Sequence, residues 1–300
     1  MSVFPTTSLL MVICTATPFY HLEKHGAIEY RRSDIISPMH ILVTNDDGVL
    51  APGLLALATA MRELGNVTVL APDHNWSASG HVKTMERPLR VKPVQLADGT
   101  SALASDGAPS DCVALAALGL LSEKVDLVVS GINPTENVGH DVTYSGTVTA
   151  AMEAAIWGMP GIAVSLDTPT DLNGTLDFTP SAQVAKKIVK LVIENGLPEE
   201  SLLNINVPYL PFEQIKGLLI TRQGLRVYRD LLVSREDPRG RPYYWIGGEA
   251  PTGVPEEGTD IGALSEGFVS VTPLHLDMTA YRSMETMRDW DWNGDNQKIK

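Results

Sequence analysis

Short apolar runs alternate with helix-like periodicity over most of the chain. Five runs that end in polar or proline-containing turns predict buried strands at 40–45, 67–72, 125–133, 161–166 and 202–208. Apolar residues recur at helical spacing, or fill the segment, in helices that we predict at 52–64, 112–121, 145–158 and 181–196. Continuous apolar strands separated by helices indicate a parallel sheet covered on both faces. We therefore predict a doubly wound, mostly parallel α/β core over about residues 39–210.

Beyond residue 210 the pattern changes to strand-like alternation. We expect a strand at 217–224, a β-hairpin at 226–248 and a late strand at 268–280. The hairpin turns at Asp237–Gly240, where Pro and Gly suit a tight turn. Its Tyr243, Tyr244 and Trp245 carry more aromatic surface than an isolated hairpin can bury, and such hairpins are marginally stable in water. We therefore predict that the hairpin is exchanged with another subunit.

The first 38 residues differ from the rest of the chain. Segment 8–19 is apolar and short, as in a signal peptide, yet residues 1–7 contain no Lys or Arg. We therefore favour a loosely ordered extension, or a start assigned too early with Met39 as the true first residue. We divide the remainder into a core at about 39–210, an oligomerisation hairpin at about 217–262, and a C-terminal strand and tail at 263–300.

The amino-acid composition excludes several classes of protein. With 44% hydrophobic and 20% charged residues, the chain can bury a sizeable core. No apolar run approaches the roughly 18 residues of a membrane-spanning helix, so we expect no membrane partner. The net charge of -13 disfavours polymeric nucleic acid as a stable partner, because that needs clustered Lys and Arg. Cys14 and Cys112 are the only cysteines and lack metal-binding spacing, so we expect a reducing, cytoplasmic compartment.

Polar side chains follow three of the predicted strands. Asp46 and Asp47 follow the first strand, Asn75 and Ser77 lie in the loop after the second, and Asn133 ends the third. Because the carboxyl ends of parallel strands share one edge of a sheet, these groups can meet. Their oxygens suit Mg²⁺, Mn²⁺ or Ca²⁺, and a cation would relieve the repulsion between the adjacent carboxylates. The alternative is turn chemistry, since Asn-Asp-Asp-Gly closes strands in many proteins.

A second cluster of small polar residues opens the helix predicted at 145–158. Ser145, Gly146 and Thr147 follow a glycine-containing polar loop. The first N–H groups of a helix lack partners and carry partial positive charge, so they bind anions such as phosphate. The alternative is that Ser145 is an ordinary N-cap residue.

Several common catalytic motifs are missing from the sequence. We find no GxxxxGK[ST] loop, no GxGxxG after a strand, no GxSxG and no HExxH. His74, His81 and His140 lie near the two polar clusters, and each is a candidate proton donor to a leaving alkoxide. For each histidine taken alone, a surface or packing role is the simpler interpretation.

Blocks in this order resemble the SurE (survival protein, 5'-nucleotidase) family. They are ILVTNDDGVLAPG (41–53), VLAPDHNWSASG (69–80), LVVSGINPTENVGHDVTYSGTVTAAMEA (127–154), PGIAVSL (160–166), LLNINVP (202–208) and YYWIGG (243–248). The resemblance implies a Rossmann-like core and a C-terminal hairpin and helix exchanged between subunits of a homodimer or homotetramer. It also implies a metal-dependent phosphatase of nucleoside 5'- and 3'-monophosphates.

The resemblance assigns roles residue by residue. The metal ligands would be Asp46, Asp47, Ser77 and Asn133, holding one divalent cation (Mg²⁺ or Mn²⁺) per subunit. Asp46 and Asp47 would be catalytic. We place substrate and phosphate binding on Asn45, Gly48, Ser77, Asn133, Ser145, Gly146 and Thr147. Gly107 and Asp111 match a further family block, and we expect Asp111 to cap the helix that begins near Cys112.

The function that we predict is hydrolysis of nucleoside monophosphates to nucleoside and phosphate by a metal-activated water. A non-catalytic nucleotide or metal sensor on the same scaffold is the alternative, because a fold does not fix an activity. A sugar-nucleotide transferase is a weaker third candidate, since nothing in the chain resembles a second substrate domain.

Overall fold

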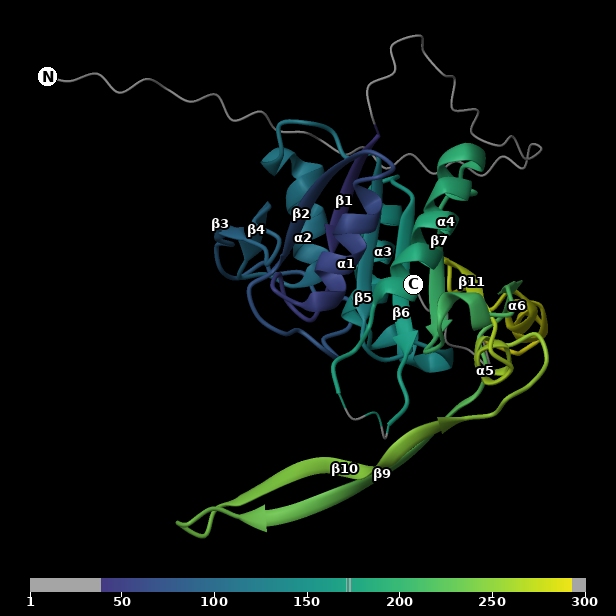
Figure 1. The fold of residues 1–300 in the computed structure, drawn as a ribbon. Helices are drawn as coiled ribbons and strands as arrows, with labels where there is room; N and C mark the ends of the chain where they lie inside the picture. The colour runs from purple at the N-terminus through teal and green to yellow at the C-terminus, as the bar shows by residue number, and fades with distance from the viewer. Residues whose placement is uncertain (1–38, 171, 173, 293–300) are drawn as a thin grey trace, which may run out of the picture.

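A central nine-stranded sheet and a separate two-stranded arm form the computed structural model (Figure 1). The structure describes residues 39–170, 172 and 174–292. The strand order of the large sheet is β3-β4-β2-β1-β5-β6-β7-β11-β8, and the arm pairs β9 with β10. The predictions made for residues 1–38 lie outside the described residues.

The elements have the following bounds. The strands are β1 (His40–Thr44), β2 (Asn66–Pro72), β3 (Val91–Gln95), β4 (Ser101–Ser105), β5 (Leu127–Asn133), β6 (Gly161–Asp167), β7 (Ser201–Pro208), β8 (Leu218–Ile220), β9 (Arg226–Glu236), β10 (Pro242–Gly253) and β11 (Val269–His275). The helices are α1 (Pro52–Met61), α2 (Pro109–Leu115), α3 (Gly146–Ile156), α4 (Thr179–Asn195), α5 (Asp260–Ser265) and α6 (Tyr281–Arg288). Shorter turns of helix cover Ala116–Leu120, Gly139–Thr143 and Phe212–Gln214.

The chain reverses its direction of travel across the sheet next to β1. From β1 it proceeds outward to β2 and β4, and then returns to place β5 on the other side of β1. Both neighbours of β1 run parallel to it, with Thr44 opposite Ser130. Loops that leave adjacent parallel strands in opposite directions open a crevice at their carboxyl ends, where α/β proteins bind ligands. The ends of β1 and β5 therefore form the switch point of this fold.

Alternate side chains of the buried strands pack on the two faces of the sheet. In β1, Ile41 and Val43 belong to the core formed with α1 and α4, whereas Leu42 packs in the core formed with α2 and α3. All five residues of β1 are buried. A strand covered on both faces needs apolar side chains in succession, which explains the continuous run in the sequence.

The predicted fold class is confirmed, but several boundaries differ. The sheet continues past residue 210, because β11 pairs antiparallel with β7 and β8 joins its far side. The strands expected at 217–224 and 268–280 are shorter, at Leu218–Ile220 and Val269–His275. The helix expected at 112–121 begins at Pro109, and regular helix is lost within Ala116–Leu120, where Gly119 has a non-helical φ of +96°.

The β9–β10 arm extends away from the sheet (Figure 1). Its strands pair antiparallel from Pro242 opposite Glu236 to Gly253 opposite Arg226. Large apolar side chains remain exposed along it, at Leu231, Leu232, Tyr244, Trp245 and Ile246. Within the described part of the chain, we find no helix with the length and apolar character needed to cross a bilayer.

Candidate active site

Asp46 lies directly beyond β1 and is held by the start of α3. Its side chain is buried, with 3% of the residue exposed, and the Thr147 hydroxyl donates a hydrogen bond to its Oδ1. Burial raises the pKa of Asp46, while hydrogen bonds from Thr147 and Gly146 act in the opposite direction. The first turn of α3 thus partly compensates a carboxylate that the fold removes from water.

Gly146 permits this close approach of α3 to β1. A Cβ at this position would lie 2.7 Å from Cβ of Asp46 and 3.0 Å from its Oδ2. The preceding Ser145 is the N-cap residue, and its hydroxyl accepts a hydrogen bond of 3.2 Å from the Val148 N–H. The helix N-terminus therefore contacts a resident carboxylate. Phosphate binding by Ser145, Gly146 and Thr147 remains a prediction.

Asp47 is less buried than Asp46 and has different surroundings. We find no hydrogen bond to its carboxylate from any residue that the structure describes. Burial, and then the negative charge of Asp46, raise the pKa of Asp47 to about 7. Two adjacent carboxylates in this state favour either a shared proton or a bound cation.

The Ser77 loop, residues 73–80, is attached to the same strand end. The Trp76 N–H donates to the backbone oxygen of Asp46 at 2.7 Å. The Ser77 N–H donates to Oδ1 of Asn75 at 2.7 Å, which makes an Asx turn that leaves Ser77 exposed. Gly48 adopts φ +107°, a conformation that glycine tolerates best, where the chain passes the loop. The structure thus brings together the loops that follow the first and second predicted strands.

Two asparagine side-chain oxygens at the switch point receive no hydrogen bond from the residues that the structure describes. Asn133 ends β5, and its Nδ2 donates to the Thr135 backbone oxygen at 2.6 Å. No residue in the described ranges donates to its Oδ1. Asn45 donates from Nδ2 to the Gly48 oxygen at 3.0 Å, while its buried Oδ1 has no partner within the described chain. Carbonyl-type oxygens and carboxylates are the donors that a hard cation uses.

The donor set fits a hard divalent cation and not a thiolate or imidazole site. Across residues 39–170, 172 and 174–292, no group of three His, Cys, Asp or Glu side chains could hold a metal ion. A cation here would therefore depend on Asp46, Asp47 and neutral oxygens such as those of Ser77 and Asn133. The described residues show no direct hydrogen bond that joins Asp47, Ser77 and Asn133.

Other predicted residues have structural partners. Asp111 accepts hydrogen bonds from the Ala108 N–H at 2.9 Å and the Thr84 hydroxyl at 2.6 Å, so it caps α2 as expected. His74 pairs with Asp73 at 2.6 Å. His81 contacts Glu153, a buried residue to which sequence analysis gave no role. Glu153 lies in the block at 127–154 that resembles the family, and that block was the available signal.

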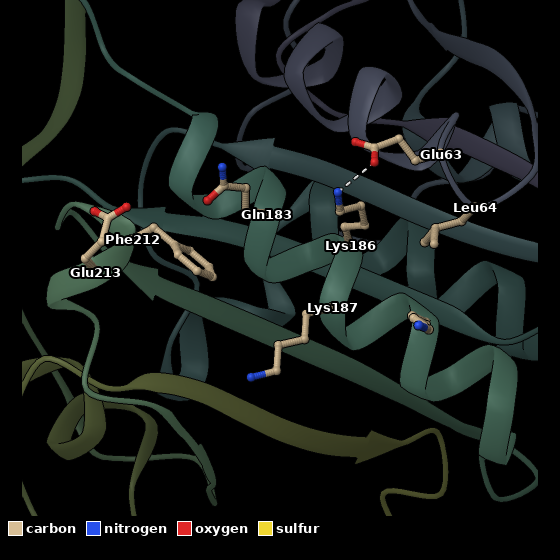
Figure 2. Close-up of a pocket in the computed structure, with 8 residues that line it drawn as sticks. Glu63, Leu64, Gln183, Lys186, Lys187, Phe212 and Glu213 are labelled. Carbon is tan, nitrogen blue, oxygen red and sulfur yellow. Dashed lines mark hydrogen bonds and ion pairs between the residues drawn. The ribbon is translucent and has the colours of Figure 1, made fainter.

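A groove of about 720 Å³ lies elsewhere, on the face of the sheet that carries α4 (Figure 2). It is lined by Glu63, Leu64, Gln183, Lys186, Lys187, Lys190, Phe212 and Glu213. Lys186 pairs with Glu63 at 2.8 Å. None of the predicted site residues lines this groove.

Comparison with known proteins gives consistent matches over the described chain. The family model "Survival protein SurE" matches residues 41–230. A protein named 5'-nucleotidase SurE from Chloroflexus aggregans is 54% identical over 254 residues, covering 85% of this chain and 100% of that protein. A protein of the same name from Herpetosiphon aurantiacus is 52% identical over 255 residues, covering 85% and 99%.

A solved structure is also similar to this chain. The crystal structure of the SurE protein from Aquifex aeolicus superimposes with a TM-score of 0.70 at 42% sequence identity, covering 83% of this chain and 98% of that chain. The matched region contains both polar clusters and all four predicted metal ligands. On these sequence and structure matches, the chain belongs to the SurE family.

Proposed function

We propose that this protein is a metal-dependent 5'-nucleotidase that hydrolyses nucleoside 5'-monophosphates, and also 3'-monophosphates, to nucleoside and phosphate. The observation that carries the proposal is the pair Asp46 and Asp47 at the switch point, against the first turn of α3. Support also comes from relatives named 5'-nucleotidase SurE, which this chain matches over 99–100% of their length.

The proposed cofactor is one Mg²⁺ or Mn²⁺ per subunit. Asp46, Asp47, Ser77 and Asn133 would hold it with four oxygen atoms. When bound, such a cation supplies polarisation of the phosphoryl oxygens and a lowered pKa for a coordinated water. Two observations support this assignment: no described residue donates a hydrogen bond to the Asp47 carboxylate or to Oδ1 of Asn133, and Asp46 repels the charged form of Asp47.

The chain's own residues would orient the phosphate and accept a proton. Asn45, Gly48 and the 145–147 turn lie around Asp46, where N–H groups can stabilise the charge that spreads over phosphoryl oxygens. Thr147 holds Asp46 in one orientation by its hydrogen bond. Asp47 has no such donor in the described chain. We therefore propose that Asp47 accepts the proton of the attacking water.

A substrate panel tests the proposal. Purified protein should release phosphate from AMP or GMP when Mg²⁺ or Mn²⁺ is present, and Asp47→Asn should abolish most of that release. Nucleotide binding without turnover of any phosphomonoester would refute hydrolysis and favour a non-catalytic sensor.

We also propose a homodimer or homotetramer assembled by exchange of the β9–β10 arm. The arm pairs only with itself among the described strands, and its Trp245 and Ile246 are 64% and 83% exposed. Exposed apolar patches of this kind favour a protein partner. Light scattering that gives a monomer at micromolar concentration would contradict the proposal. A cytoplasmic location remains our proposal, supported by the buried, unpaired Cys112.

A further inference from the structure

Glu153 is a buried carboxylate on α3 that the proposed chemistry does not use. Only 3% of the residue is exposed. Its oxygens contact His81 Nε2 at 2.9 Å, Lys83 Nζ at 3.3 Å and Trp157 Nε1 at 2.8 Å. A buried charge is costly unless it is paired and hydrogen-bonded, and here all three partners are donors.

Two of these partners belong to the segment that follows Ser77. His81 and Lys83 lie four and six residues beyond Ser77, whereas Trp157 directly follows α3. The Ser77 loop, which carries a proposed metal ligand, therefore begins directly after Pro72 and ends directly before His81. Glu153 is the α3 residue that this segment reaches with charged side chains.

Further hydrogen bonds hold the Ser77 loop at its N-terminal and C-terminal sides. On the N-terminal side, the Trp76 N–H bonds to the Asp46 oxygen at 2.7 Å. On the C-terminal side, the Gly80 N–H donates to the Tyr144 oxygen at 2.9 Å, and the Thr149 hydroxyl donates to the Gly80 oxygen at 3.2 Å. Between these anchors Ser77 is exposed, so its position depends on how firmly both sides are held.

We propose that Glu153 is a positioning residue: through His81 and Lys83 it fixes the Ser77 loop against α3. The inference rests on the proposed function in so far as Ser77 is a ligand of the cation. Helix α3 then contributes at both ends of the site, because its first turn holds Asp46 and its third turn holds the loop. Partners behind a ligand commonly affect metal affinity by about tenfold to a hundredfold.

The test uses His81, because changing it leaves Glu153 paired with Lys83 and Trp157. His81→Ala removes the contact, whereas His81→Gln keeps an N–H donor at this position. Glu153→Gln is a second variant, which keeps the shape and removes the charge. Glu194→Gln, on the exposed surface of α4, is the matched control.

Two readouts accompany phosphate release. Calorimetry should show Mn²⁺ bound about tenfold more weakly by His81→Ala and Glu153→Gln, with near wild-type binding by His81→Gln and Glu194→Gln. Amide hydrogen exchange of residues 77–83 should accelerate in His81→Ala and stay unchanged in the control.

Wild-type exchange at 77–83 and wild-type Mn²⁺ affinity in His81→Ala would overturn the inference. Loss of kcat with unchanged Mn²⁺ affinity would also overturn it, and would identify His81 as a proton donor instead. If the wild-type protein neither bound Mn²⁺ nor released phosphate, the proposed function would fail. The exchange measurement would still decide whether Glu153 holds the loop.

Discussion

Two carboxylates that are adjacent in the sequence have unequal surroundings in the fold. Asp46 is buried and receives a hydrogen bond from Thr147, whereas Asp47 is partly exposed and has no donor in the described chain. A residue already engaged with the protein is suited to a fixed role. A residue with free oxygens is suited to the cation and the attacking water.

Replacing Asp47 should lower the catalytic rate without lowering the stability of the fold. Asp47→Asn should lower kcat for AMP more than tenfold, equivalent to more than about 1.4 kcal/mol of transition-state stabilisation. The Tm should not fall, because the change removes repulsion by Asp46. Steady-state kinetics and thermal unfolding measure both. A variant that keeps more than about a tenth of the wild-type rate would contradict the role of Asp47.

The carboxylate of Asp167, at the end of β6, predicts a pH dependence of stability. Burial, and then the charge of Glu136, raise the pKa of Asp167 to about 6, while Arg226 acts in the opposite direction. A pKa that is higher in the folded state means stability is fully present below about pH 4 and is lost as pH rises through about 6.

Asp167→Asn should therefore raise the Tm at pH 8, where wild-type Asp167 is ionised. We expect a gain on the order of 1 kcal/mol, or about 2 °C, reduced by partial exposure of the side chain. The gain should disappear below about pH 4. Thermal unfolding at both pH values measures it, and an equal effect at both would show that the charge of Asp167 is not the cause.

At the scale of elements, the site depends on the close packing of α3 against the end of β1. Gly146 makes the packing possible, since any larger residue would meet Asp46. Alanine is a better helix former than glycine, so propensity alone predicts that Gly146→Ala is stabilising.

Gly146→Ala should instead destabilise the protein by about 1–3 kcal/mol and lower kcat at least tenfold, because α3 or Asp46 must shift. The control is Gly247→Ala in β10, where an added Cβ would meet its nearest neighbour at 3.4 Å. Chemical unfolding and phosphate release measure the two effects. Wild-type behaviour of Gly146→Ala would show that this contact does not define the site.

Elements with strong patterns were predictable, and those with mixed patterns were not. Every residue of β1 and β5 is buried because both faces of these strands are covered, and most of their side chains are apolar. The edge strand β3 contains Pro93 and exposed polar residues, so its pattern resembles a loop. The helices α5 and α6 are short, and α6 buries none of its residues, which leaves no apolar stripe to detect.

The candidate site was likewise predictable only in part. Shared strand ends predicted that the loops after β1 and β2 would meet, and the Trp76–Asp46 hydrogen bond bears that out. The contact of Asp46 with Thr147 was not predicted, because it joins residues 101 positions apart through packing of α3. The Glu153–His81 pair was missed for the same reason.

At the scale of the whole molecule, the arm joins the site through its base. Arg226, at the start of β9, pairs with Glu136 and Asp141 at 2.8 Å each, in the segment that leads from Asn133 to α3. The body of the sheet is covered on both faces, whereas the arm exposes its aromatic residues. The proposed assembly would bury that surface.

Charged substitutions on the arm should therefore disperse the oligomer. The double variant Trp245→Glu and Ile246→Glu should shift the mass measured by light scattering toward the monomer at micromolar concentration, because burying unpaired charge is costly. Leu118→Glu, at a position that is 69% exposed outside the arm, is the control. An unchanged oligomer in the arm variant would contradict exchange through this surface.

The central claim is that oxygens at the β1–β5 switch point hold a divalent cation that phosphomonoester hydrolysis requires. The most direct measurement is phosphate release from AMP and GMP by EDTA-dialysed protein, before and after addition of Mn²⁺ or Mg²⁺. The account predicts near-complete loss after dialysis and recovery with either metal, but no recovery in Asp47→Asn. Hydrolysis that is unchanged after dialysis would contradict it.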